Sequence, residues 1–149
     1  MKSSPSDLFA GFTLREKSKL VVLGSSDSLS ETILDLFRSL NFIEHVSLAS
    51  LIRPEISRHG SLRLAASDNA TFKLVRKWFW SRKPDAGFVL WDFPATLLQA
   101  LTLDEWLDVR QENLDVVFHN EGSSPLTPLS IHYRNHGLLH RATDIASVL

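Results

Sequence analysis

The chain has 149 residues, of which 44% are hydrophobic and 22% are charged, and its formal net charge at pH 7 is -1. We expect one globular domain from this length and composition, and the small net charge excludes broad, salt-driven binding of nucleic acid. The chain contains no cysteine, which excludes disulfides, thiolate zinc sites and a cysteine nucleophile.

Neither a targeting segment nor a membrane span is indicated by the sequence. Residues 1–12, MKSSPSDLFAGF, contain one lysine and no apolar run of signal-peptide length. No stretch approaches the roughly 18 apolar residues that a membrane helix needs. We therefore expect a cytoplasmic protein with no membrane partner, in which residues 1–18 form an N-terminal extension and residues 19–149 form a single domain.

The apolar periodicity predicts strands that alternate with helices. In chain order the predicted elements are a strand at 20–23, a helix at 28–40, a short strand at 45–47, helices at 49–59 and 70–82, a strand at 87–91, a helix at 96–113, a strand at 115–119, a helix at 128–135, a strand at 138–141 and a brief C-terminal helix. Asn41 is predicted to be a left-handed cap, and a capping box at Thr102 is predicted to divide the helix at 96–113. Strands joined by connections of helix length predict a parallel sheet covered on both faces.

The helix predicted at 70–82 is amphipathic and basic. Its apolar residues recur every three or four positions, and the opposite side carries the cations Lys73, Arg76, Lys77 and Arg82. Three consecutive aromatic residues at 78–80 do not fit on one face of a helix. We therefore expect Trp80 near the surface, either partly covered by a loop or as part of a protein-interaction patch.

The stretch KLVVLGSSDSLSET at 19–32 combines a buried strand, a glycine-led turn and the start of a helix. Backbone N–H groups at such a turn bind phosphate or another small anion. The candidate residues of this turn are Gly24, Ser25, Ser26, Ser28, Ser30 and Thr32. Ser28 and Glu31 also have the spacing of a capping box, in which the helix supplies its own anion. Both interpretations remain open at this point.

The order of these blocks resembles that of adenylate kinases and related nucleoside monophosphate kinases, over about residues 19–145. The blocks are the strand, turn and helix at 19–40, HVSLASLIR at 45–53, GFVLWDFPATLLQA at 87–100, LDVVF at 114–118 and PLSIHYRNHGLLHR at 128–141. The resemblance implies a three-layer α/β fold of the P-loop kinase type. It also implies a five-stranded parallel sheet of order 2-3-1-4-5, with helices on both faces, and phosphoryl transfer from ATP to AMP with magnesium.

The phosphate loop departs from the pattern of that family. Gly24 and Thr32 match the first glycine and the final threonine of G-x-x-x-x-G-K-G-T, whereas Leu29, Ser30 and Glu31 replace a glycine, the lysine and another glycine. These changes add a Cβ, remove a cation and add a carboxylate where phosphate would bind. Residues 119–125 also replace the arginine-bearing lid of the family with a short connection.

The block that binds AMP in the family is partly kept. Arg53 matches the arginine that holds the AMP phosphate, and Gln99 matches the glutamine that reads the adenine edge. Three positions depart from the pattern, since Leu48 replaces a threonine, Ala95 replaces an arginine, and the aspartate is displaced by one residue to Asp92. From the residues alone, a surface ion pair of Arg53 and a local hydrogen bond of Gln99 are equally open alternatives.

His132 and His136 lie one helical turn apart, and His140 follows nearby. Two histidines at this spacing can hold zinc, but no third ligand has a recognisable spacing. We therefore expect a solvated face and no metal site. No nucleophile-elbow pattern is present, so no catalytic residue is assigned.

The resemblance and its departures together predict an adenylate-kinase-like protein that is catalytically inactive and binds a nucleotide or an anion weakly at most. No cofactor is expected. Two alternatives remain open. One is an active nucleoside monophosphate kinase that uses ATP and magnesium, with an atypical site completed by a partner's arginine or lysine. The other is a protein-interaction module without a ligand. Expected partners are a nucleoside monophosphate or small anion, another protein or a second copy of the chain.

Overall fold

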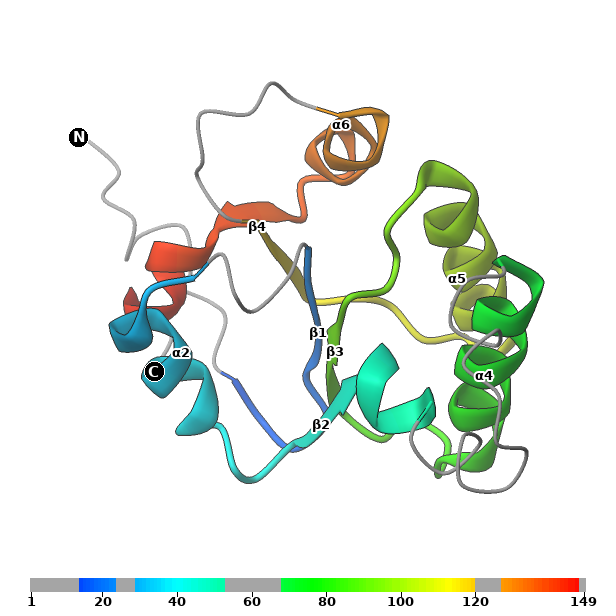
Figure 1. Cartoon of the computed structure of the whole chain (residues 1–149), viewed down its shortest axis with the longest axis horizontal. Helices are drawn as coiled ribbons and strands as arrows, with labels where there is room; N and C mark the ends of the chain where they lie inside the picture. The colour runs from blue at the N-terminus through cyan, green and yellow to red at the C-terminus, as the bar shows by residue number, and fades with distance from the viewer. Residues whose placement is uncertain (1–13, 24–28, 53–67, 120–126, 148–149) are drawn as a thin grey trace.

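The computed structural model describes residues 14–23, 29–52, 68–119 and 127–147 (Figure 1). In chain order the elements are β1 (Lys19–Val22), α2 (Glu31–Arg38), β2 (Glu44–Ser47), α4 (Asp68–Ser81), β3 (Phe88–Trp91), α5 (Leu97–Val109), β4 (Val116–His119), α6 (Pro128–Asn135), β5 (Leu139–Arg141) and the 3-10 helix η3 (Ala142–Ser147). Residues 48–52 are also helical.

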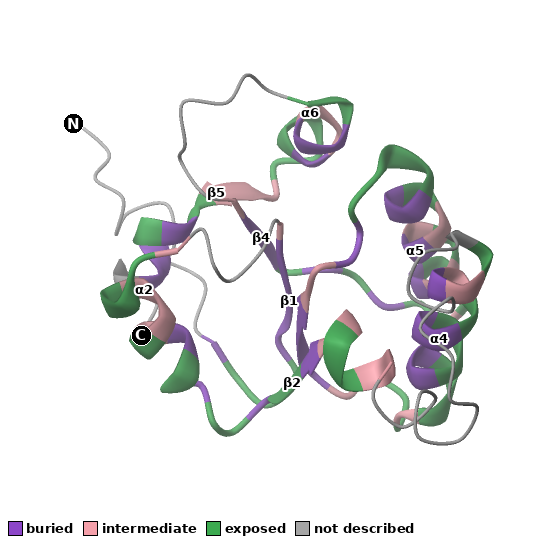
Figure 2. Cartoon of the chain, viewed as in Figure 1, coloured by how far each residue is buried: buried purple, intermediate pink, exposed green. Residues whose placement is uncertain are grey.

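The five strands form one parallel sheet in the order β2-β3-β1-β4-β5. The predicted sheet and its strand order are thereby confirmed. β1 lies at the centre, and Val21 pairs with Leu90 of β3 on one side and with Val117 of β4 on the other. The apolar runs of β1, β3 and β4 suit central strands because both of their faces are covered, whereas the edge strands β2 and β5 are more exposed (Figure 2).

Two hydrophobic clusters cover opposite faces of the sheet. Leu20 and Val22 point to one face, where they pack with Phe37 of α2 and Ile145 of η3. Val21 points to the other face, and the cluster there includes residues of α4, α5 and α6. Figure 1 shows α2 and η3 on one side of the sheet and α4, α5 and α6 on the other. The alternation along β1 follows from the period of two in a strand.

Most predicted element boundaries agree with the structure to within two residues, but two local predictions are wrong. α5 is one continuous helix, because the Thr102 hydroxyl donates to the carbonyl of Leu98 at 2.8 Å instead of capping a new helix. α2 ends at Arg38 with Ser39 as its right-handed C-cap. Positive φ angles among the described non-glycine residues occur at Asp85, Asp92 and Gln111, so Asn41 is not a left-handed cap. The remainder of the helix predicted at 49–59 lies outside the described residues.

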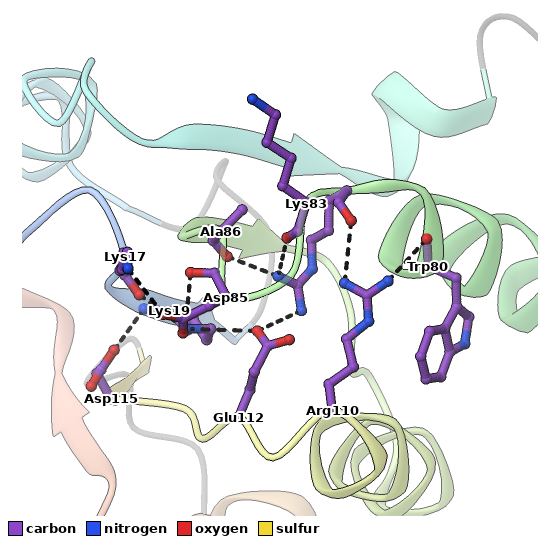
Figure 3. A network of polar contacts seen from close by, with 10 residues as sticks. Lys17, Lys19, Trp80, Lys83, Asp85, Ala86, Arg110, Glu112 and Asp115 are labelled. Atoms are coloured by element: carbon purple, nitrogen blue, oxygen red, sulfur yellow. Dashed lines mark hydrogen bonds and ion pairs between the residues drawn. The ribbon is translucent and has the colours of Figure 1, made fainter.

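A network of charges, of which Lys19, Arg82 and Glu112 are buried, joins the amino ends of β1, β3 and β4, which we call the amino edge of the sheet (Figure 3). Lys19 donates to Asp85 at 2.7 Å, and its Nζ lies 3.7 Å from Glu112 Oε1. Glu112 Oε1 also accepts from Arg82 Nη2 at 2.9 Å, and the side chains of both residues are almost fully buried. The hydrogen bond from Lys19 and its charge hold the pKa of Asp85 below the usual range.

Arg82 was predicted to lie on the exposed basic face of α4, and this prediction is wrong. Lys73, Arg76 and Lys77 are exposed as expected, but α4 ends at Ser81 and the Arg82 side chain turns inward. Its guanidinium carbon lies 4.3 Å from the ring centroid of Phe79, so the cation contacts both an aromatic face and a carboxylate. Trp80 is 37% exposed, which agrees with its predicted place near the surface.

Among the residues that the structure describes, no helix has both the length and the apolar character needed to cross a bilayer.

Candidate functional site

The carboxyl ends of β1, β3 and β4 meet at one edge of the sheet, where ligands of parallel α/β proteins usually bind. Val22 pairs there with Trp91 and with Phe118. α2 and α5 each begin just after a strand ends, so their N-termini lie at this carboxyl edge. Of the residues predicted to form the site, Ser30, Thr32 and Gln99 are described. The remaining ones, Gly24, Ser25, Ser26, Ser28 and Arg53, lie outside the described residues.

Ser30 caps helix α2. Its backbone is extended, and its Oγ accepts a hydrogen bond from the backbone N–H of Ile33 at 3.3 Å. The predicted capping box of Ser28 and Glu31 is therefore wrong by two residues. Glu31 is the first residue of the helix, where its carboxylate complements the positive end of the helix dipole. One helix N–H is thus bonded to a side chain of the protein itself, and a carboxylate is placed in the first turn.

Arg38, in the last turn of α2, forms ion pairs with Glu31 and Asp35. Its Nη1 lies 3.5 Å from Glu31 Oε2 and 3.0 Å from Asp35 Oδ1. All three side chains are largely exposed, so these contacts are surface ion pairs. Two carboxylates balance one guanidinium, and the described part of α2 therefore offers no excess positive charge to a phosphate.

Gln99 is 4% exposed and makes a local contact at the start of α5. Its Oε1 accepts from the backbone N–H of Ala95 at 2.7 Å, and its own backbone N–H donates to the cap hydroxyl of Thr96 at 3.2 Å. The side-chain carbonyl therefore holds the turn that follows β3. This contact corresponds to the local hydrogen-bonding alternative for Gln99. The amide NH₂ is the part of the group that remains for a ligand.

A cavity of about 360 Å³ lies between α2 and the carboxyl ends of β2 and β3. Its polar lining consists of Arg38, His45, Ser47 and Asp92, and the indole of Trp91 forms one wall. His45 is held at both ring nitrogens, since Nε2 donates to the Leu40 carbonyl at 2.9 Å and Nδ1 accepts from Trp91 Nε1 at 3.4 Å. These two hydrogen bonds fix the orientation of the imidazole at the wall of the cavity.

Sequence reasoning missed this cavity. Asp92 was noted only as a displaced carboxylate, and the structure gives it a left-handed φ of 68° directly after β3. Arg38 and His45 were not among the predicted site residues, and they come from different elements. The sequence contained one signal. Trp91 ends a predicted strand at the position where the family pattern has a carboxylate.

The histidines predicted to form a solvated face are only partly exposed to solvent. His132 is mostly buried, and its Nε2 donates to Asp104 Oδ2 at 2.7 Å. His136 is exposed as predicted, and burial lowers the pKa of His140. In the described ranges, no three His, Cys, Asp or Glu residues are grouped so that they could hold a metal ion.

The comparisons with known proteins do not assign a family to this chain. No protein-family model matches the sequence, and no curated protein matches it. The resemblance to adenylate kinases therefore rests on the order of the sequence blocks.

Proposed function

We propose that this chain is an adenylate-kinase-like protein that does not transfer phosphoryl groups and that binds a nucleoside monophosphate or a small anion weakly. The parallel sheet of order 2-3-1-4-5 is the fold that the resemblance implies, and it supports the family part of the proposal. The observation that carries the inactive part is the N-terminus of α2, where Ser30 caps the helix and Glu31 occupies the first turn.

The carboxylate of Glu31 opposes triphosphate binding through like-charge repulsion. Two unit charges about 4 Å apart interact with about 4 kcal/mol at an effective dielectric of about 20, but Glu31 is 81% exposed and paired with Arg38, so its repulsion of a phosphate is well below this figure. A phosphate loop normally supplies the opposite sign through a lysine, and Ser30 stands at that position. Because phosphoryl transfer depends on charge neutralisation and positioning, the loss of the lysine and the added carboxylate act in the same direction.

A monophosphate carries less charge than a triphosphate, and the resemblance places its phosphate near Arg53 rather than at the start of α2. Weak binding of AMP is therefore compatible with the charges at α2. The cytoplasm is the compartment that we propose for this role, in keeping with a chain that has no cysteine.

Calorimetric titration with AMP tests the binding part of the proposal. We expect saturable binding of AMP that weakens at least 10-fold in the Arg53→Ala variant, because a charge-assisted contact to phosphate is lost. Arg76→Ala is the matched control, since Arg76 is an exposed cation of α4, and its affinity for AMP should equal that of the wild type.

Two outcomes of this titration would count against the binding proposal. An affinity that is unchanged in Arg53→Ala would remove Arg53 from the phosphate contact. The absence of any heat with AMP and with phosphate, together with self-association, would favour the alternative of a protein-interaction module.

A further inference from the structure

A second and larger cavity of about 610 Å³ lies between α5 and α6. Leu114 and Leu138 line it and lie just before β4 and β5, two residues and one residue from the strand starts, so this amino-edge cleft lies at the opposite end of the strands from the carboxyl edge. Small-molecule sites usually measure about 300–1,000 Å³ and have mostly apolar walls with a few polar groups. The cleft has this character, because Leu101 and Leu107 of α5 complete its apolar wall.

Two side chains of the cleft contain buried polar atoms without a partner. Tyr133 is 1% exposed, and its hydroxyl makes no hydrogen bond. Glu112 is also buried, and its Oε2 makes none, although its Oε1 accepts from Arg82. Within the described residues only Arg82 Nε shares this condition. Buried polar atoms without partners are costly in proteins, so two in the lining of one cleft point to a ligand that satisfies them.

The charges of the cleft indicate the sign of that ligand. Asp104, Asp108 and Glu112 line it together with His132 and His136. Asp104 accepts from His132 Nε2, and the His136 Nδ1–H donates to the His132 carbonyl at 2.7 Å, so both histidine donors are already used. Asp108 makes no ion pair with a described residue. Glu112 is balanced by Arg82 and Lys19, so Asp108 supplies the unpaired negative charge of the cleft, and hydrogen-bond acceptors are in excess.

The Tyr133 hydroxyl is a further hydrogen-bond acceptor in the lining of the cleft. Burial and the charge of Asp104 raise the pKa of Tyr133 well above its usual value, so the hydroxyl stays neutral. A neutral hydroxyl has lone pairs that can accept from a ligand and one proton that can be donated.

We propose that the amino-edge cleft binds a small organic cation, an amine or amidine with an apolar body, whose N–H groups bond to Asp108 and to the unpaired acceptors of Glu112 and Tyr133. The leucines contact the apolar body, and the carboxylates select the positive head. This site is separate from the carboxyl edge and uses none of the residues that the proposed function invokes.

Titration of the ¹⁵N-labelled full chain with benzamidine, followed by amide chemical shifts, tests this proposal. We expect saturable shifts confined to α5, α6 and the segments before β4 and β5. Benzamide, the neutral analogue, should bind at least 10-fold more weakly, and benzoate should not bind. Equal shifts with benzamide and benzamidine, or shifts confined to other parts of the chain, would overturn the proposal.

Three variants test the roles of the charge and of the unpaired hydroxyl. Asp108→Asn removes the carboxylate at an exposed position and should weaken benzamidine binding at least 10-fold, whereas Glu105→Gln, an exposed carboxylate of α5 outside the cleft lining, should leave it unchanged. Tyr133→Phe removes the unpaired hydroxyl, so we expect an equal or higher melting temperature without ligand and weaker benzamidine binding. Unchanged affinity in both Asp108→Asn and Tyr133→Phe would overturn the proposal. No nucleotide is used, so failure here leaves the proposed function standing.

Discussion

Replacing Glu112 with alanine is expected to lower the free energy of unfolding by about 3–5 kcal/mol, because it removes the carboxylate shared by two buried cations. Arg82 Nη2 lies 2.9 Å and Lys19 Nζ lies 3.7 Å from Glu112 Oε1, and all three side chains are at least 95% buried. Lys19 keeps its hydrogen bond to Asp85 in the variant, but Arg82 loses the only carboxylate that it contacts within the described residues. Urea denaturation measures this loss.

Arg38→Ala is the matched control for burial. Arg38 also makes two ion pairs, with Glu31 and Asp35, but its side chain is 64% exposed. Exposed pairs contribute about 0–1 kcal/mol, so this variant should lose less than about 1 kcal/mol. Similar losses in the two variants, or a Glu112→Ala protein as stable as the wild type, would show that the amino-edge network contributes little to stability.

Replacing Gly87 with alanine is expected to cost about 3 kcal/mol, because the added Cβ collides with backbone atoms. An ideal Cβ at this position would lie 2.1 Å from the Glu16 carbonyl oxygen and 2.6 Å from that of Ser18. These carbonyls also accept hydrogen bonds from Gly87 N and Phe88 N at 3.1 and 3.0 Å. The methyl group therefore forces apart the segment before β1 and the start of β3, and the thermal unfolding transition should shift to lower temperature.

Gly137→Ala separates a steric clash from backbone strain. Gly137 follows α6 with a φ of +71°, and a Cβ there would meet no atom within 4 Å. Only the left-handed conformation is penalised, at about 1 kcal/mol. A loss in Gly87→Ala no larger than that in Gly137→Ala would contradict the close approach of the two backbones.

Features that depend on local pattern were predictable from the sequence. Apolar runs such as the one at 20–23 identify strands buried on both faces, and the helix at 128–135 has its predicted bounds because Thr127 caps it and Pro128 suits its first turn. The strand order came from the family resemblance rather than from periodicity, and the structure has that order.

Features that depend on contacts distant in the sequence were not predictable. Arg82 fell on the polar side of a helical repeat, but the helix ends one residue before it and its partner, Glu112, lies 30 residues further along the chain. His132 is paired with Asp104 across 28 residues, which no spacing rule indicates. The sequence pattern placed the cap of α2 at Ser28, whereas Ser30 caps the helix, because more than one serine before the helix has a hydroxyl that can accept from a helix N–H.

The candidate site was predicted only in part. Ser30 and Gln99 lie at the carboxyl edge, as the resemblance implies, but each makes a local hydrogen bond to the backbone. The cavity beside Trp91 and the amino-edge cleft are formed by residues from separate elements and have no motif. Their recognition required the three-dimensional arrangement.

We propose that this chain does not transfer phosphoryl groups, and the formation of ADP from ATP and AMP with magnesium tests this proposal most directly. We expect no more ADP than in a reaction without protein, because Ser30 stands where the family pattern has a lysine and Glu31 adds a carboxylate. The control is the Arg53→Ala variant, which identifies activity from a contaminating kinase. Magnesium-dependent ADP formation by the wild type that is lost in Arg53→Ala would contradict the claim.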